Sequence, residues 1–207
     1  MTFIINQICV VFIKMVIGSH NSWSYLPLQQ WWMKPFFFIA RCQSKSIYEQ
    51  YHKYNVRCFD LRIRFDKNDN IIIAHGFAKY KISDEQLADD LDFINSTHDS
   101  YVRVLLEIRN QKAYTDHQRE MFRQWCDKVV KDYPNIIFWC GRSLVNYTNP
   151  DYIFKNNPSC EEKYSSVCKP LWVDDWCPWI YAKLHNKENI QTGTDKNILL
   201  IDFVNIQ

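Results

Sequence analysis

Glycine is scarce in this chain, with four among 207 residues, at positions 18, 76, 141 and 193. The G-x-G-x-x-G fingerprint of dinucleotide-binding proteins and the G-x-x-x-x-G-K loop of nucleoside triphosphatases both need glycines a few residues apart. No two glycines of this chain lie so close together. Glycine-rich nucleotide cradles are therefore excluded, and any phosphate chemistry must rest on side chains.

A strong charge of one sign and a long apolar run are also missing. The net charge is +2 at pH 7, which is too mild for the basic stripe of a nucleic-acid-binding protein. The apolar N-terminal stretch is interrupted by Asn6 and Gln7 and is shorter than the roughly 20 residues of a membrane-spanning helix. It also lacks the basic start and small-residue cleavage site of a signal peptide. We expect a monomer that binds no nucleic acid, either cytoplasmic or peripheral at a membrane surface.

The eight cysteines are scattered, and no C-x-x-C pair occurs. Cys58 and Cys140 fall inside expected strands, where a small buried thiol is the ordinary interpretation. Cys160, Cys168 and Cys177 share one loop-like region, where disulfide pairing stays open. Zinc there is disfavoured, because paired zinc ligands usually lie about two to four residues apart. We expect no cofactor and no metal.

Strand-like and helix-like patterns alternate along the chain. The expected strands are 15–17, 56–65, 71–75, 102–109, 136–140, 171–173 and 198–204, and the expected helices are 46–54, 83–95 and 115–132. This alternation predicts one α/β domain over residues 1–207 with a parallel sheet, although 141–170 looks irregular. A doubly wound sheet also fits, but the missing phosphate-loop glycines favour a barrel. Since such barrels typically have about 250 residues, we expect a compact, distorted TIM-like (β/α) barrel.

Two of these strands carry charges on one face and apolar side chains on the other. The charged positions are Asp60, Arg62, Arg64, Arg103, Glu107 and Arg109. If the apolar faces meet helices, the charges point into the barrel, where a buried charge needs a partner or a charged ligand. The excess of arginine suggests an anionic guest, and guanidinium groups suit phosphate. Structural ion pairs or a solvent-exposed sheet face are the alternatives.

His20 and His75 each end an expected strand, at the position where β/α-barrel enzymes place catalytic groups. Two histidines facing an arginine suit phosphodiester cleavage by internal attack. One imidazole takes the proton from a neighbouring hydroxyl, the other protonates the leaving alkoxide, and the arginine holds the phosphoryl oxygens. Asp202, an acid within the apolar terminal strand, can orient a histidine and stabilise its cation. A purely structural role is the alternative for each residue.

Four segments together resemble the X-domain of phosphatidylinositol-specific phospholipases C, in its bacterial and X-domain-only forms. They are Gly18-Ser-His-Asn-Ser22, Gln43-Ser-Lys-Ser-Ile-Tyr-Glu-Gln50, Val56-Arg-Cys-Phe-Asp-Leu-Arg62 and Ala74-His-Gly76. The resemblance covers residues 15 to about 110 and the terminal LLIDFV, whereas 141–195 shows no clear match.

The resemblance implies a distorted β/α barrel and a phospholipase C-type phosphodiesterase, a lyase and hydrolase of lipid metabolism. It implies that His20 is the general base, His75 the general acid, Arg62 the phosphate-binding arginine and Asp202 the acid that orients His20. The inositol 2-hydroxyl would attack phosphorus, giving a cyclic inositol phosphate and diacylglycerol. The neighbouring charges are then the expected substrate-binding groups: Asp60, Arg64, Glu107 and Arg109.

Asn21 departs from the bacterial pattern, which commonly has Asp after the first histidine to support the second. Asn can position His75 but cannot stabilise its charge. The calcium-dependent members have Asn there as a ligand, yet Arg62 and Arg109 stand where they need further carboxylates, and Asp60 alone leaves too few oxygen ligands. We therefore expect metal-independent chemistry. A non-catalytic barrel that binds anionic headgroups is an alternative, as is a related phosphodiesterase on another substrate. A metal-dependent glycerophosphodiesterase is disfavoured by Asn21 and Arg62.

Aromatic residues make up 16% of the chain, and many of them lie between positions 23 and 38, directly after His20. Trp31, Trp32, Phe36 and Phe37 are expected to touch a membrane surface, helped by the nearby cations Lys34 and Arg41. The alternative is that this stretch packs over the rim of the barrel.

Overall fold

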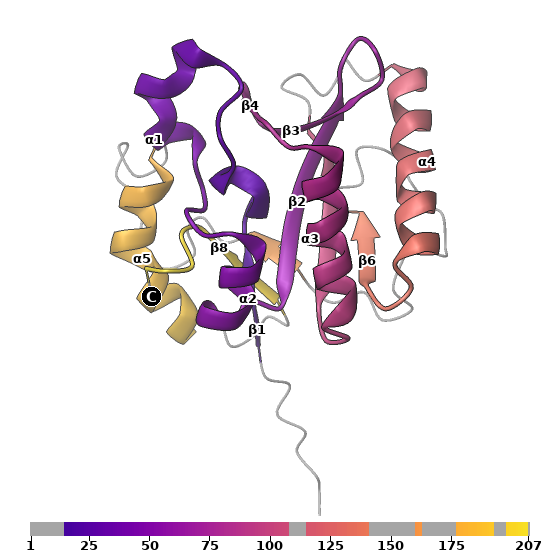
Figure 1. Cartoon of the computed structure of the whole chain (residues 1–207). Helices are drawn as coiled ribbons and strands as arrows, with labels where there is room; N and C mark the ends of the chain where they lie inside the picture. The colour runs from indigo at the N-terminus through magenta and orange to yellow at the C-terminus, as the bar shows by residue number, and fades with distance from the viewer. Residues whose placement is uncertain (1–14, 108–114, 141–159, 163–176, 193–197, 207) are drawn as a thin grey trace, which may run out of the picture.

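The computed structural model describes residues 15–107, 115–140, 160–162, 177–192 and 198–206 (Figure 1). Six parallel strands form the main sheet in the order β6-β5-β2-β1-β8-β7. Their bounds are β1 (Val16–Ser19), β2 (Cys58–Phe65), β5 (Tyr101–Leu106), β6 (Ile137–Cys140), β7 (Cys160–Glu162) and β8 (Ile198–Ile201).

The sheet is curled but open. Within the described residues β6 and β7 form the two ends of the parallel strand order and do not pair with each other. A complete barrel closes with eight parallel strands, so the architecture is a curled half-barrel. The prediction of an α/β chain with a mainly parallel sheet is confirmed, and the expected distorted barrel takes the form of a half-barrel that the described strands do not close.

An antiparallel hairpin extends the sheet beside the second half of β2. It consists of β3 (Ile71–His75) and β4 (Ala78–Tyr80), with Ile73 opposite Ile63 of β2. The turn between them needs Gly76, whose φ of 55° favours glycine. The backbone of residues 27–29 runs along β4, since the amide of Gln29 bonds the carbonyl of Lys79 at 2.8 Å. The hairpin thereby turns His75 back toward the start of β2.

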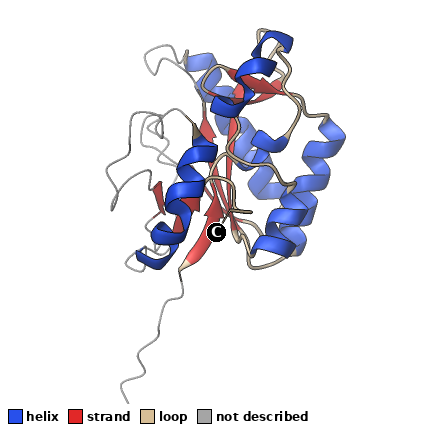
Figure 2. Ribbon diagram, turned by 90° about the vertical axis from the view of Figure 1, so that its left-hand side faces the viewer, coloured by secondary structure: helices blue, strands red, loops and turns tan. Residues whose placement is uncertain are grey.

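Helices surround the strands, which run through the middle of the molecule in Figure 2. They are α1 (Phe37–Ala40), α2 (Ile47–Tyr54), α3 (Asp84–Ser96), α4 (Asp116–Asp132) and α5 (Pro178–Thr192), with short 3-10 turns η1 (Ser22–Tyr25) and η2 (Trp31–Phe36) before α1. The predicted starts of α2, α3 and α4 are confirmed. The side chains of Ser46, Ser83 and Thr115 accept hydrogen bonds from the first turns of these helices, as N-caps do.

The apolar face of β2 forms the core with the helices. Phe59, Leu61 and Ile63 are fully buried in one cluster with Leu91 of α3 and Phe122 of α4. Successive side chains of a strand point to opposite faces, so Asp60 and Arg62 lie on the face away from these helices. The predicted separation of apolar and charged faces is therefore present in the structure.

Gly18 lets β1 approach its neighbours closely. A Cβ there would overlap Leu200 of β8 and lie 3.0 Å from the Cβ of Cys58 in β2. Cys58, Ile198 and Leu200 form a small buried cluster on this side of the sheet. The last residue of β1 is thereby held directly against both flanking strands, which places His20 next to the ends of both.

Several elements differ from expectation. The sequence pattern missed β4, β7 and α5, and the expected strand at 171–173 lies outside the described residues, as do residues 108 and 109 of the expected strand 102–109. The terminal strand ends at Ile201 rather than at 204, because the chain turns at Phe203 with a φ of 44°. In the described ranges we find no helix with the length and hydropathy that crossing a membrane requires.

Candidate active site

His20 and Asp202 follow two neighbouring parallel strands. Ser19 of β1 pairs in register with Ile201 of β8, so the residues that come next lie side by side. The Nδ1 of His20 is 2.7 Å from Oδ1 of Asp202, and both residues are buried. A carboxylate in this position orients the imidazole and stabilises the cation that forms when the ring takes a proton. The Nε2 atom is then the one that exchanges protons.

Gln43 holds this pair in place. From the sequence it has no predicted role of its own and is included only in the segment 43–50. It is fully buried, and its Nε2 donates to the carbonyls of His20 at 3.1 Å and Ile201 at 2.8 Å. Its Oε1 accepts from the amide of Val204 at 3.1 Å. One side chain therefore ties the ends of β1 and β8 and the terminal turn together.

His75 faces His20 from the end of β3. The two ring centroids are 5.6 Å apart and the planes are nearly perpendicular. The Nδ1 of His75 lies 3.0 Å from the carbonyl oxygen of Ala40, which also accepts from the hydroxyl of Tyr80 at 2.7 Å. A carbonyl only accepts, so Nδ1 carries the hydrogen and Nε2 is the exchangeable atom. Burial, and after it the charge of Arg62, lower the pKa of His75.

The strand charges form a buried network around Asp60. Arg62 Nε donates to Asp60 at 2.9 Å, and Arg103, opposite Asp60 in the register of β2 and β5, lies 3.4 Å from its other oxygen. Arg62 also lies 3.6 Å from Glu107, which accepts from the amide of Gly76 at 2.9 Å. Burial alone would raise the pKa of Asp60, but Arg62 and Arg103 lower it below its usual value. The network joins the phosphate-binding candidate Arg62 to the turn after His75.

Asn21 is fully buried but does not hold His75. Its backbone amide donates to Asp60 at 3.0 Å, and its φ of 45° is in the left-handed region that Asn tolerates. Its side-chain amide has no hydrogen-bond partner among the described residues. The carbonyl of Ala40, rather than the side chain of Asn21, holds Nδ1 of His75 in the structure.

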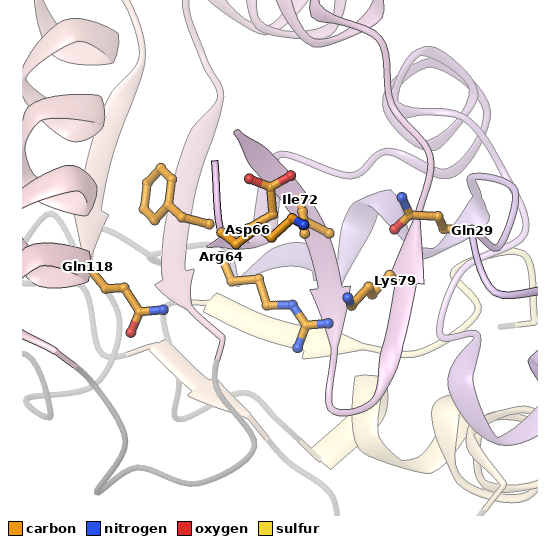
Figure 3. A pocket seen from close by; sticks show the side chains of 8 residues that line it. Gln29, Arg64, Asp66, Ile72, Lys79 and Gln118 are labelled. Carbon is orange, nitrogen blue, oxygen red and sulfur yellow. The ribbon is translucent and has the colours of Figure 1, made fainter. Parts of the chain in front are cut away.

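Arg64 lies further along β2 and lines a separate cavity of about 750 Å³. Figure 3 shows the side chains of Arg64 and Lys79 reaching into the same space, with Gln29 and Gln118 at its sides. The lining holds three cations, Arg64, Lys67 and Lys79, and one carboxylate, Asp66. Arg109, expected with Arg64 among the substrate-binding groups, lies outside the described residues.

Trp23, at the start of the aromatic segment after His20, is fully buried, whereas the aromatic side chains from position 31 onward are largely exposed. Trp31 is 78% exposed, and Trp32, Phe36 and Phe38 are each about half exposed, at 51%, 51% and 53%. Phe37 differs, because it is partly buried and its ring lies 3.8 Å from the guanidinium carbon of Arg41. Packing over the rim therefore accounts for Phe37 but not for the other four side chains.

Of the three cysteines in the late loop region, Cys177 is a buried free thiol whose sulfur donates to the carbonyl of Phe38 at 3.7 Å. The side chain of Cys160 and the whole of Cys168 lie outside what the structure describes.

Comparison with solved structures identifies similar folds. The H258Y mutant of the phosphatidylinositol-specific phospholipase C from Staphylococcus aureus aligns with a TM-score of 0.62 and 15% identity, covering 91% of this chain and 84% of that one. A structure of the same enzyme concerned with the modulation of its membrane binding aligns at 0.43 and 23% identity, over 60% of this chain and 40% of that one. The chain thus spans about two-fifths of that second structure. No protein-family model and no curated protein matches. The fold is therefore similar to that of phosphatidylinositol-specific phospholipase C.

We predict that Asp60→Ala lowers the free energy of unfolding by about 3–5 kcal/mol at pH 7, because it leaves buried guanidinium groups without their carboxylate. The low pKa of Asp60 means that its contribution is present above about pH 3.9, its unfolded value, and is lost as the pH falls through the lower folded value. Urea unfolding at pH 7 and near pH 3 measures both effects. Asp92→Asn, at an exposed position of α3, is the control, and an Asp60→Ala protein as stable as this control would contradict the network.

Proposed function

We propose that the protein is a phosphatidylinositol-specific phospholipase C-like phosphodiesterase, which cleaves an inositol phospholipid to a cyclic inositol phosphate and diacylglycerol. The observation that carries the proposal is the buried His20–Asp202 pair with His75 5.6 Å away, beside an arginine held by carboxylates. The sequence motifs and the similar fold of the S. aureus enzyme support it. Both oxygens of Asp60 face arginines, which favours chemistry without a calcium ion.

In the proposed reaction His20 Nε2 takes the proton of the inositol 2-hydroxyl, and Asp202 stabilises the imidazolium that forms. The hydroxyl oxygen bonds to phosphorus while the bond from phosphorus to the diacylglycerol oxygen breaks. His75 Nε2–H gives its proton to that leaving oxygen. Arg62 holds the phosphoryl oxygens and compensates their charge. Slower hydrolysis of the cyclic product uses the same two histidines with their roles exchanged.

The acid step depends on cationic His75, and its environment opposes that form. Burial and Arg62 lower its pKa, and Asn21 carries no charge that would offset them. A bound phosphodiester brings a negative charge beside Arg62 and thereby favours the cation. We therefore infer that turnover is fastest at mildly acidic pH.

The exposed aromatic side chains suit a lipid substrate. Trp31, Trp32 and Phe36 point from η2 into solvent together with the exposed cation Lys34, a combination that favours the interface of an anionic bilayer. The S. aureus enzyme has been studied for its membrane binding. Peripheral contact at a membrane surface would bring the site to its substrate without extraction of the lipid.

The cavity of Arg64 and Lys79 suits a second anionic group. A guanidinium and an ammonium that share one cavity bind a phosphate better than a hydroxyl. We assign this cavity to an additional phosphate on the inositol ring, beyond the phosphodiester that is cleaved.

A second function, headgroup binding without turnover, is favoured by one observation. The lowered pKa of His75 and the uncharged neighbour Asn21 weaken the general acid but leave the binding arginines intact. Binding of a soluble headgroup to a protein that releases no product would support this alternative.

His20→Ala and His75→Ala are each expected to lower the release of cyclic inositol phosphate by at least about 100-fold, because each removes one proton-transfer group. Phosphorus NMR on phosphatidylinositol vesicles, with and without EDTA, measures the product. His117→Ala, at an exposed histidine of α4, serves as the control and keeps wild-type turnover. Activity retained in either active-site variant contradicts the assigned roles.

Asn21→Asp is expected to raise the pKa of His75 by placing a carboxylate in the site. Because the acid must be protonated, activity falls as the pH rises through this pKa, which lies below about 6.5 in the wild type. The falling limb of the profile of kcat/KM against pH should therefore move to higher pH in the variant. Asn21→Gly, which suits the left-handed backbone, is the control and leaves the limb in place. If the falling limb of the pH profile does not move in Asn21→Asp, the residue at position 21 does not influence the pKa of His75.

Arg64→Gln and Lys79→Gln are each expected to raise KM roughly tenfold for phosphatidylinositol that carries an extra ring phosphate, through loss of one charge-assisted hydrogen bond. The KM for plain phosphatidylinositol should change little. Lys128→Gln, an exposed lysine of α4, controls for a general loss of positive charge. An equal change for both lipids would count against a second phosphate in this cavity.

A further inference from the structure

The two proposed proton-transfer groups, His20 and His75, lie close to a cysteine, and all three are residue types that bind metals. Ligand atoms of His20, Cys42 and His75 all lie within 4.8 Å of one another. The sulfur of Cys42 is 3.7 Å from Nδ1 of His75. The three residues come from the end of β1, the segment after α1 and the end of β3. The proposed reaction uses both histidines but leaves the thiol without a role.

Both imidazoles are held as in metal sites. A histidine that binds a metal almost always donates its other ring N–H to a carboxylate or a backbone carbonyl. Here Nδ1 of His20 faces Asp202 at 2.7 Å, and Nδ1 of His75 faces the carbonyl of Ala40 at 3.0 Å. The partner of His20 leaves Nε2 as its metal-binding atom. His75 can bind through Nε2 with this hydrogen bond kept, or through Nδ1, which lies beside the sulfur of Cys42, with the hydrogen bond given up.

The thiol is held in place by the backbone around it. Cys42 is fully buried, its amide donates to the hydroxyl of Ser24 at 3.0 Å, and its carbonyl accepts from the amide of Phe203 at 2.6 Å. Burial, and after it the charge of Asp202, raise the pKa of Cys42 well above its usual value. The thiol is therefore protonated at neutral pH, and a metal would have to displace its proton.

The charges around the cluster sum to a small negative value, although Arg62 by itself disfavours a cation at His75. Three carboxylates and one guanidinium group act on Cys42 or His75, and a second guanidinium group pairs with one of these carboxylates: Asp60, Glu107, Asp202, Arg62 and, paired with Asp60, Arg103. With neutral histidines this set carries one net negative charge, and a thiolate would add a second. Two imidazoles and a thiolate are ligands typical of zinc, whereas calcium and magnesium prefer oxygen.

We propose that His20, Cys42 and His75 form a three-ligand zinc site whose fourth position is open to water or substrate. Zinc bound there holds a ring nitrogen of each histidine, so neither imidazole is free to transfer its proton, and the enzyme is reversibly inhibited. The inhibition rests on the function proposed above, whereas the binding of zinc does not.

Titration of metal-free protein with Co²⁺, a spectroscopic substitute for zinc, tests the site directly. One equivalent should produce a near-ultraviolet thiolate-to-cobalt band, and Zn²⁺ should abolish it by displacement. Because one thiol proton is released, affinity should rise about tenfold per pH unit near neutrality. Cys42→Ala should remove the band and weaken zinc binding about 100-fold, and Cys42→Ser does the same if the alanine variant does not fold.

Cys126→Ala is the matched control, because Cys126 is a fully buried cysteine of α4, an element that contributes no residue to the cluster. It should leave the cobalt band and the zinc affinity unchanged. Absence of the band in the wild type, or its survival in both Cys42 variants, overturns the site.

Activity assays separate failure of the site from failure of the proposed function. Zinc should inhibit wild-type turnover, and EDTA should restore it. In Cys42→Ala, the zinc concentration for half-inhibition, measured against that variant's own metal-free rate, should rise at least tenfold. If the protein shows the cobalt band but has no turnover without metal, the zinc site is supported and the proposed enzymatic function is contradicted. If the protein is active and zinc does not inhibit it, the zinc site is contradicted and the proposed function is not.

Discussion

The carboxylate of Asp60 is the interaction on which the arrangement of the site depends. It accepts from the amide of Asn21 after β1, from Arg62 of β2, and lies 3.4 Å from Arg103 of β5, so it joins three strands. A fully buried carboxylate is tolerated only because these donors compensate its charge. The same contacts orient Arg62 beside His75. The arginines that stabilise buried Asp60 on the inner face of the half-barrel are therefore also the groups that can bind an anion.

The two histidines differ in their hydrogen-bond partners, and these partners suit them to different roles. His20 has a carboxylate on Nδ1 and is suited to becoming a cation, whereas His75 has a carbonyl on Nδ1 and an arginine nearby. Two neutral imidazoles with a thiol close to both are also a good set of ligands for zinc. Acid–base chemistry and zinc binding thus compete for the same two imidazoles, and the bound ligand decides which one prevails.

Much of the local structure could be predicted from particular residues. Strict alternation along 56–65 identified β2 and its two faces. The helices expected from 46, 83 and 115 begin at those places, where Ser46, Ser83 and Thr115 are the N-caps. The hairpin strand β4 was missed because three residues are too few for a periodic signal. Helix α5 was missed because its apolar side chains do not gather on one face of the sequence pattern. The open curl of the sheet could not be predicted, since closure depends on how strands far apart in the chain meet.

The sequence by itself determined the chemistry available: two histidines at strand ends, arginines alternating with apolar residues, and an acid in the terminal strand. The tertiary structure decided which of these groups meet. The register of β1 with β8 brings Asp202 to His20 across 182 positions of the chain. The end of α1 gives His75 the carbonyl of Ala40, and the segment after it brings the thiol of Cys42 next to His75 and close to His20. Contacts of this kind follow from strand register and backbone turns, which no local pattern of residues encodes.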